Sequence, residues 1–106
     1  MAGELADLLD AWQPALLELV RLTAEAGSAL GKPVGVCGEA ASDPLLALVF
    51  IGLGVTSLSM APVSVPAVRA AVAAHTLAEC RGLAGLALEA EDGRAARTAV
   101  RAATRS

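Results

Sequence analysis

Two short runs of small and β-branched residues, each closed off by glycine or proline, constrain this fold more than any other sequence feature. The first run covers residues 32–37 and the second covers residues 55–60. Runs of this length and composition are typical of strands that are buried on both faces. Pro62 and Pro66 follow the second run and prevent it from continuing, because proline cannot donate to a sheet ladder.

A helix is expected between these two strands. Asp43 is suited to the N-cap, where its carboxylate accepts hydrogen bonds from free amides, and Pro44 is suited to the first helical position. Residues 45–51 are all apolar, and Gly52 and Gly54 are expected to end the helix. Strand, short helix and strand in this order predict two parallel strands joined by a right-handed crossover.

Helices are also expected on both sides of this unit. Residues 14–26 carry apolar side chains at helical spacing, and the pattern stops near Gly27. The apolar face expected for this helix comprises Leu16, Leu19, Val20 and Thr23. Further along, Thr76 and Glu79 have the spacing of a capping box, which predicts a helix that continues to about residue 90.

Three features of the C-terminal third need an interpretation. Gly82 and Gly85 each weaken the predicted helix by roughly 1 kcal/mol relative to alanine, so we expect close packing at both positions. Cys80 is expected to be a packing residue of the same helix. After Gly93, one helical face is expected to carry Arg94, Arg97, Arg101 and Arg105. A charged terminal stripe of this kind is usually a solvated face, and we interpret it so.

The segment around Cys37 resembles a known family. Residues 31–44 place Cys37, Gly38 and Glu39 after a run of glycine and valine, and residues 52–60 read Gly-Leu-Gly-Val before Leu-Ser-Met. This pattern resembles the last two strands of the phosphoenolpyruvate-binding barrel in the phosphoenolpyruvate-protein phosphotransferase family, enzyme I of the bacterial sugar phosphotransferase system. Pyruvate phosphate dikinase has a similar Cys-Gly-Glu segment. The resemblance extends over most of the chain, including residues 11–14 and the segment from residue 76.

The resemblance implies a catalytic role for Cys37. In the family, a histidine on a separate domain takes the phosphoryl group from phosphoenolpyruvate and passes it to the carrier HPr, and the barrel cysteine protonates C3 of the enolate that remains. Taken alone, a free cysteine beside glycine is usually a small buried hydrophobe. The family binds Mg²⁺ through residues of earlier strands, so no metal ligand is expected in this chain. The only histidine, His75, is expected to cap a helix or to lie on the surface.

The predicted fold class is α/β: a partial (β/α)8 TIM barrel, with its last two parallel βα units flanked by N- and C-terminal helices. We divide this C-terminal fragment into a helical lead-in (1–30), two βα units (31–75) and C-terminal helices (76–106). A complete barrel takes roughly 250 residues, whereas this chain has 106. The isolated chain is therefore expected to be inactive, although its parent enzyme would act on phosphoenolpyruvate to give pyruvate.

Two other functions remain open from the sequence. A non-catalytic oligomerisation module is one, because strands with unpaired edges need partner chains, and the family barrel dimerises; we expect a homo-oligomer. A small membrane protein is the other, because no charged residue occurs between Asp43 and Arg69 and the mean hydropathy is +0.62. The prolines and serines within that gap make a membrane span the weaker alternative.

Composition argues against several further classes. A net charge of −3 and only two aromatic residues, one Trp and one Phe, disfavour a nucleic-acid partner. Two cysteines without a CxxC spacing disfavour a zinc site or a disulfide scaffold. The first residues lack the basic segment and apolar core of a signal peptide, so we expect a cytoplasmic protein with no membrane partner.

Overall fold

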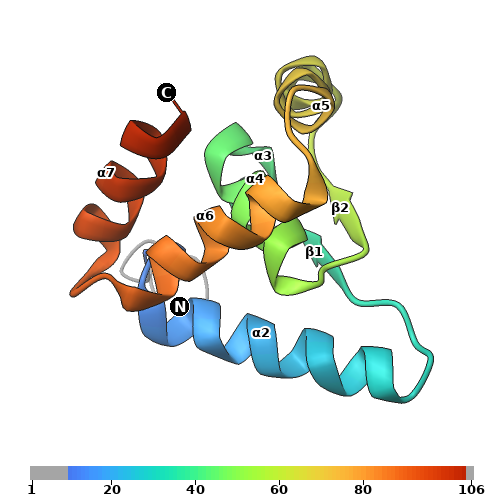
Figure 1. Cartoon of the computed structure of the whole chain (residues 1–106). Helices are drawn as coiled ribbons and strands as arrows, with labels where there is room; N and C mark the ends of the chain where they lie inside the picture. The colour runs from blue at the N-terminus through green and yellow to red at the C-terminus, as the bar shows by residue number, and fades with distance from the viewer. Residues whose placement is uncertain (1–9, 105–106) are drawn as a thin grey trace, which may run out of the picture.

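The structure is a computed structural model that describes residues 10–104. Residues 1–9 of the expected lead-in, together with Arg105, lie outside the described residues. Helices make up most of the molecule, and a small sheet lies at one side of it (Figure 1). In chain order the elements are α2 (Pro14–Ala29), β1 (Gly35–Cys37), α3 (Glu39–Ser42), α4 (Pro44–Leu53), β2 (Ser57–Ser59), the 3-10 helix η1 (Pro62–Ser64), α5 (Val65–Ala73), α6 (Leu77–Glu89) and α7 (Gly93–Thr104).

Helix α4 is the centre of the core. It has no charged residue and is buried almost all round, because the sheet covers one side and α6 crosses the other (Figure 1). It starts as the sequence predicts and ends before Gly54, whereas Gly52, which was also expected to end it, lies inside the helix. The Asp43 carboxylate accepts from the amides of Leu45 (3.0 Å) and Leu46 (3.4 Å), and Gly54 ends the helix with φ 104°.

The two strands are parallel, which confirms the predicted strand-helix-strand unit. Val36 pairs with Leu58 at the centre of the ladder. Each strand is three residues long, shorter than predicted, because regular pairing begins only after Val34. At Val34 the Thr56 side chain takes the place of a backbone partner. Its hydroxyl accepts a hydrogen bond from the Val34 amide (2.9 Å) and donates one to the Val34 carbonyl (3.0 Å).

The expectation that both strand faces are buried is wrong. Only the middle residues, Val36 and Leu58, pack against the core, and the flanking residues of both strands are exposed. The physical reason is that α4 covers one face of the sheet, whereas no element within residues 10–104 covers the other. The fold is thus a mostly helical α/β arrangement with a two-stranded parallel sheet.

The face predicted for α2 is also wrong. The helix runs past Gly27 to Ala29, and the side chains that it buries are Leu17 and Ala24. Leu19, which was expected inside, is 59% exposed. The helix has two apolar sides, and periodicity cannot tell which of them meets α4 and α6.

The C-terminal helices confirm the capping box and correct the interpretation of the glycines. The Thr76 amide donates to Glu79 Oε1 (2.8 Å), and the Glu79 amide donates to Thr76 Oγ1 (3.1 Å). A Cβ atom at Gly82 or Gly85 would meet nothing within 4 Å, so the close packing expected at these positions is absent. The close approach occurs at Gly52 instead, which faces the carbonyl of Cys80.

Candidate functional site

The exposed face of the sheet presents one thiol and two hydroxyl groups. Side chains alternate along a strand, and paired residues share a face. Gly35 and Cys37 of β1 therefore lie on the same side of the sheet as Ser57 and Ser59 of β2, with Cys37 directly opposite Ser59. All four residues are exposed, so this face is open to a ligand.

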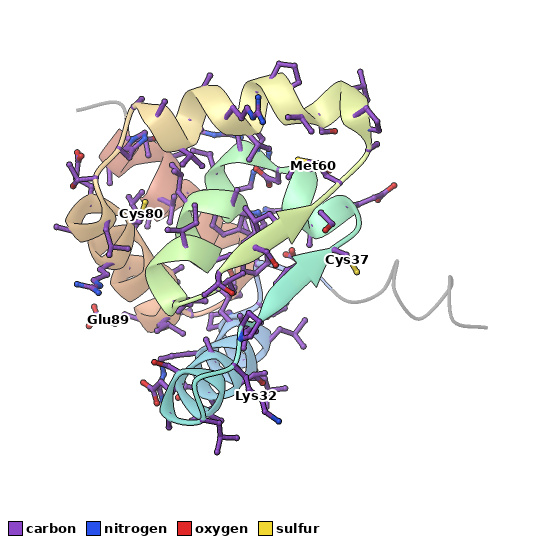
Figure 2. The ribbon with its side chains drawn as sticks, turned by 90° about the vertical axis from the view of Figure 1, so that its right-hand side faces the viewer. Lys32, Cys37, Met60, Cys80 and Glu89 are labelled. Carbon is purple, nitrogen blue, oxygen red and sulfur yellow. The ribbon has the colours of Figure 1, made fainter. Side chains whose placement is uncertain are left out.

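Cys37 is the last residue of β1, and Figure 2 shows its sulfur directed away from the ribbon. Met60 lies at the same end of the sheet as Cys37, and Lys32 lies at the opposite end (Figure 2). Because the strands are parallel, this end is the carboxyl end of both. Catalytic residues of parallel barrels come from this end of the strands.

Two glycines give this face its shape. A Cβ atom at Gly35 would lie 2.7 Å from Ser57 Oγ, so the Ser57 hydroxyl would have to rotate away to admit a side chain there. Gly38 has φ 98°, which only glycine adopts readily, and it turns the chain away immediately after Cys37. The Gly38 amide also donates to the Ser59 carbonyl (3.1 Å), which ties the two strand ends together.

The loop after Cys37 is anchored through Asp43. One carboxylate oxygen of Asp43 caps α4, and the other accepts from the indole Nε1 of Trp12 (3.1 Å). Between Cys37 and this anchor lies the short helix α3, which the sequence analysis missed because four residues are too few to show a period. Cys37 is thus held between a fixed strand and a fixed helix start.

The exposed face offers a thiol proton and hydroxyl donors but no charge of its own. Arg69 of α5 is exposed and lines a separate hollow with Leu58 and Met60. Among the residues that the structure describes, no three His, Cys, Asp or Glu side chains cluster closely enough to hold a metal ion. A thiol and hydroxyl groups can donate protons or act as nucleophiles, and this face offers both kinds of group.

The other residues singled out from the sequence lie elsewhere. Cys80 is buried and 2% exposed, as expected for a packing residue. Burial, followed by the charge of Glu79, raises the pKa of its thiol. His75 Nδ1 lies 2.7 Å from the Ala71 carbonyl at the end of α5, which places it as the expected helix cap. Both cysteines are free.

Ser57 and Ser59 are the residues of this face that the sequence analysis did not assign to the site. The alternation of inward and outward side chains within residues 55–60 could have identified them, since Leu58 between them packs against the core.

A separate finding concerns membranes: within residues 10–104 no helix combines the length and the apolar character needed to span one.

Comparison with known proteins gives consistent matches. Residues 1–77 match the profile of the PEP-utilising enzymes, PEP-binding domain. The chain is 58% identical over 100 residues to a phosphoenolpyruvate-protein phosphotransferase of Streptomyces coelicolor, covering 94% of this chain and 18% of that protein. It is 43% identical over 86 residues to a phosphoenolpyruvate-protein phosphotransferase of Haloferax volcanii, covering 81% of this chain and 15% of that protein. It is 41% identical over 88 residues to a multiphosphoryl transfer protein of Xanthomonas campestris, covering 83% of this chain and 10% of that protein. The chain therefore spans less than a fifth of the length of these relatives.

Proposed function

Because this chain belongs to the family of PEP-utilising enzymes and matches its PEP-binding domain, we propose that it is the C-terminal part of a phosphoenolpyruvate-protein phosphotransferase. The parent enzyme would move the phosphoryl group of phosphoenolpyruvate to a histidine and on to HPr during sugar uptake in the cytoplasm. The names of the similar proteins and the resemblance around Cys37 support this assignment. In the parent, the two βα units would close a (β/α)8 barrel.

Within that enzyme, Cys37 is the proton donor to enolpyruvate. When the phosphoryl group leaves phosphoenolpyruvate, the electron pair of the enolate double bond attacks the thiol proton. A C–H bond forms at C3, the S–H bond breaks, and pyruvate and a thiolate remain. The observation that supports this role best is the exposed Cys37 side chain at the carboxyl end of β1, opposite Ser59.

The Mg²⁺ ion of the parent enzyme is expected to be held by other parts of that enzyme. The described residues do not fit a metal site, since they include no suitable cluster of ligands. Binding of phosphoenolpyruvate through arginines is likewise assigned to earlier strands of the parent. The part played by this chain is to place the thiol and to shape the end of the barrel around it.

An exchange experiment on a chimera tests the role of Cys37. In the chimera, this chain replaces the matching segment of the Streptomyces coelicolor relative. We expect the chimera to exchange the C3 protons of pyruvate with solvent and to phosphorylate HPr. Cys37→Ala should lower the exchange rate by about 10²–10⁴-fold, the usual contribution of a positioned general acid.

The second cysteine provides the matched control. Cys80 is buried in α6 and away from the exposed face, so Cys80→Ala should leave exchange by the chimera within about twofold of the unaltered rate, well below the general-acid contribution. Undiminished exchange in the Cys37→Ala chimera would contradict the proposed role. The isolated chain, with or without Cys37→Ala, should show no exchange above background.

A second candidate function is a non-catalytic interaction module that forms homo-oligomers. An apolar hollow of about 370 Å³ runs between α2 and β1 and favours it. The hollow is lined by Leu16, Leu19, Val20, Val34, Val36 and Phe50, among others. In the parent enzyme the preceding barrel elements would cover this surface, whereas in the isolated chain a second copy would cover it.

A further inference from the structure

A third hollow, on the opposite side of the core from the sheet, carries a concentration of positive charge. It has a volume of about 360 Å³ and lies between Trp12 and the outer face of α7. Arg94, Arg97 and Arg101 line it, together with Asp10 and Thr98. The spacing of i, i+3 and i+7 brings the three arginines onto one stripe of the helix.

These three guanidinium groups have no carboxylate partner in the part of the chain that the structure describes. The only ion pairs there are those that Arg21 makes with Glu18 and Glu25. Those bonds lower the pKa of Glu18, through the hydrogen bond from Arg21 above all. The arginines of α7, by contrast, form no ion pair within residues 10–104, so their guanidinium groups can donate to a ligand.

The one carboxylate that lines the hollow, that of Asp10, already accepts a hydrogen bond from a neighbouring backbone amide. Asp10 Oδ1 accepts from the Trp12 amide (2.9 Å), and the same carboxylate lies against the start of α7, where Gly93 has no Cβ to obstruct it. The helix start has its own cap, since the Ala95 amide donates to Asp92 Oδ1 (2.8 Å). Within residues 10–104, the hollow therefore combines one carboxylate with three guanidinium groups that form no ion pair.

We propose that this hollow binds an oxyanion with two or more linked phosphates, such as pyrophosphate or the diphosphate of a nucleotide. Arginine suits this ligand because its planar fork matches pairs of phosphate oxygens. Arg101 lies seven positions after Arg94, which sets them about 10 Å apart along the helix axis. A single phosphate could not engage the whole stripe, whereas a phosphate chain could, and the Thr98 hydroxyl adds a further donor.

The only tryptophan of the chain provides a direct probe. Trp12 lines the hollow and is hydrogen-bonded to Asp43 at the start of α4. We would follow its fluorescence while the 106-residue chain is titrated with pyrophosphate, ADP and orthophosphate at constant ionic strength. Equilibrium dialysis with labelled pyrophosphate would measure binding independently of any change in fluorescence.

We expect saturable binding of pyrophosphate that is at least about tenfold tighter than binding of orthophosphate. ADP distinguishes the two sources of the diphosphate: tighter binding of ADP would indicate a nucleotide, and equal binding would indicate the phosphate chain alone. Arg97→Gln and Arg101→Gln should each weaken the binding about tenfold, because each removes a charge-assisted contact.

Arg81→Gln is the matched control, since Arg81 is an exposed arginine of α6 outside the hollow. This variant should bind pyrophosphate like the unaltered chain. The proposal is overturned if dialysis shows no saturable binding up to about 10 mM, the range of the weakest specific sites. It is equally overturned if Arg81→Gln weakens the binding as much as Arg97→Gln, because the attraction would then come from overall charge.

Discussion

Gly52 lies where helix α4 crosses the backbone of α6. A Cβ atom at this position would lie 2.5 Å from the carbonyl carbon of Cys80 and 2.9 Å from the amide nitrogen of Arg81. Backbone atoms cannot rotate away as a side chain can, so the two helices would have to separate. We expect Gly52→Ala to lower the free energy of unfolding by about 1–3 kcal/mol, the usual cost of overpacking, as measured by urea denaturation.

Gly82 is the matched control for this effect, because it also lies inside a helix. A Cβ atom there would meet nothing within 4 Å, and the residue is exposed. Gly82→Ala should therefore raise the free energy of unfolding by about 0.5–1 kcal/mol through the helix preference of alanine. If the two variants shifted the urea midpoint in the same direction, the close contact between α4 and α6 would be in doubt.

At the scale of elements, the capping box that starts α6 makes a prediction about stability. The Thr76 side chain satisfies the Glu79 amide at the first turn of the helix. Thr76→Ala should lower the free energy of unfolding by about 1 kcal/mol at neutral pH. Thr98→Ala is a suitable comparison, because Thr98 is exposed within α7 and caps no helix. Equal losses in the two variants would argue against the cap.

The Glu79 carboxylate adds a pH dependence to this cap. Its pKa lies below the ordinary 4.5, first because the Thr76 amide donates to it and then because of the Thr76 side chain. A lowered folded-state pKa means that the stabilisation is present above the ordinary pKa and is lost as pH falls through the folded value. The stability difference between the unaltered chain and Glu79→Ala should therefore narrow below about pH 4.

Denaturation midpoints from pH 7 down to pH 3 would measure this narrowing. Glu89→Ala is the control, because Glu89 is an exposed residue at the end of the same helix (Figure 2) and its side chain forms no hydrogen bond or ion pair within residues 10–104. A difference for Glu79→Ala that stays constant over this pH range would show that its charge does not contribute to the cap.

The elements that the sequence predicted well are those that local chemistry determines. The cap at Asp43, the glycine end of α4 and the capping box of α6 each depend on neighbouring residues, and all three are confirmed. The candidate site was predictable to the extent that Cys37 ends a strand. Alternation within the second run could have placed Ser57 and Ser59 on one face, but the pairing of Ser59 with Cys37 depends on the register between the two strands.

The elements that the sequence predicted poorly depend on contacts between distant segments. The length of β1 follows from the bonds between Val34 and Thr56, which lie 22 positions apart. The buried side of α2 follows from where α4 and α6 lie, although both of its sides are apolar. Close packing at Gly82 was inferred from the cost of glycine in a helix, but only the crossing of α4 and α6 determines where helices touch.

At the scale of the whole molecule, one side of the sheet and of α2 lacks a covering layer within the described residues. The exposed face of the strands and the apolar hollow beside α2 adjoin each other through Gly35, which belongs to both. Leu19 is the most exposed large apolar side chain of that hollow. An isolated chain with such a surface would expose apolar area to water unless it associates.

We therefore expect the isolated chain to self-associate in a concentration-dependent way, with Leu19 in the interface. Leu19→Gln should raise the dissociation constant about tenfold, since burying one leucine side chain is worth roughly 1.5–3 kcal/mol. Sedimentation velocity over a range of concentrations measures this constant.

Val63→Gln is the control, because Val63 is 87% exposed but lies in η1, outside the hollow. A chain that stays monomeric at every concentration, or that responds equally to both substitutions, would mean that a different surface, or none, mediates association. In the chimera, where the preceding barrel elements would cover the hollow, Leu19→Gln should lower the free energy of unfolding instead.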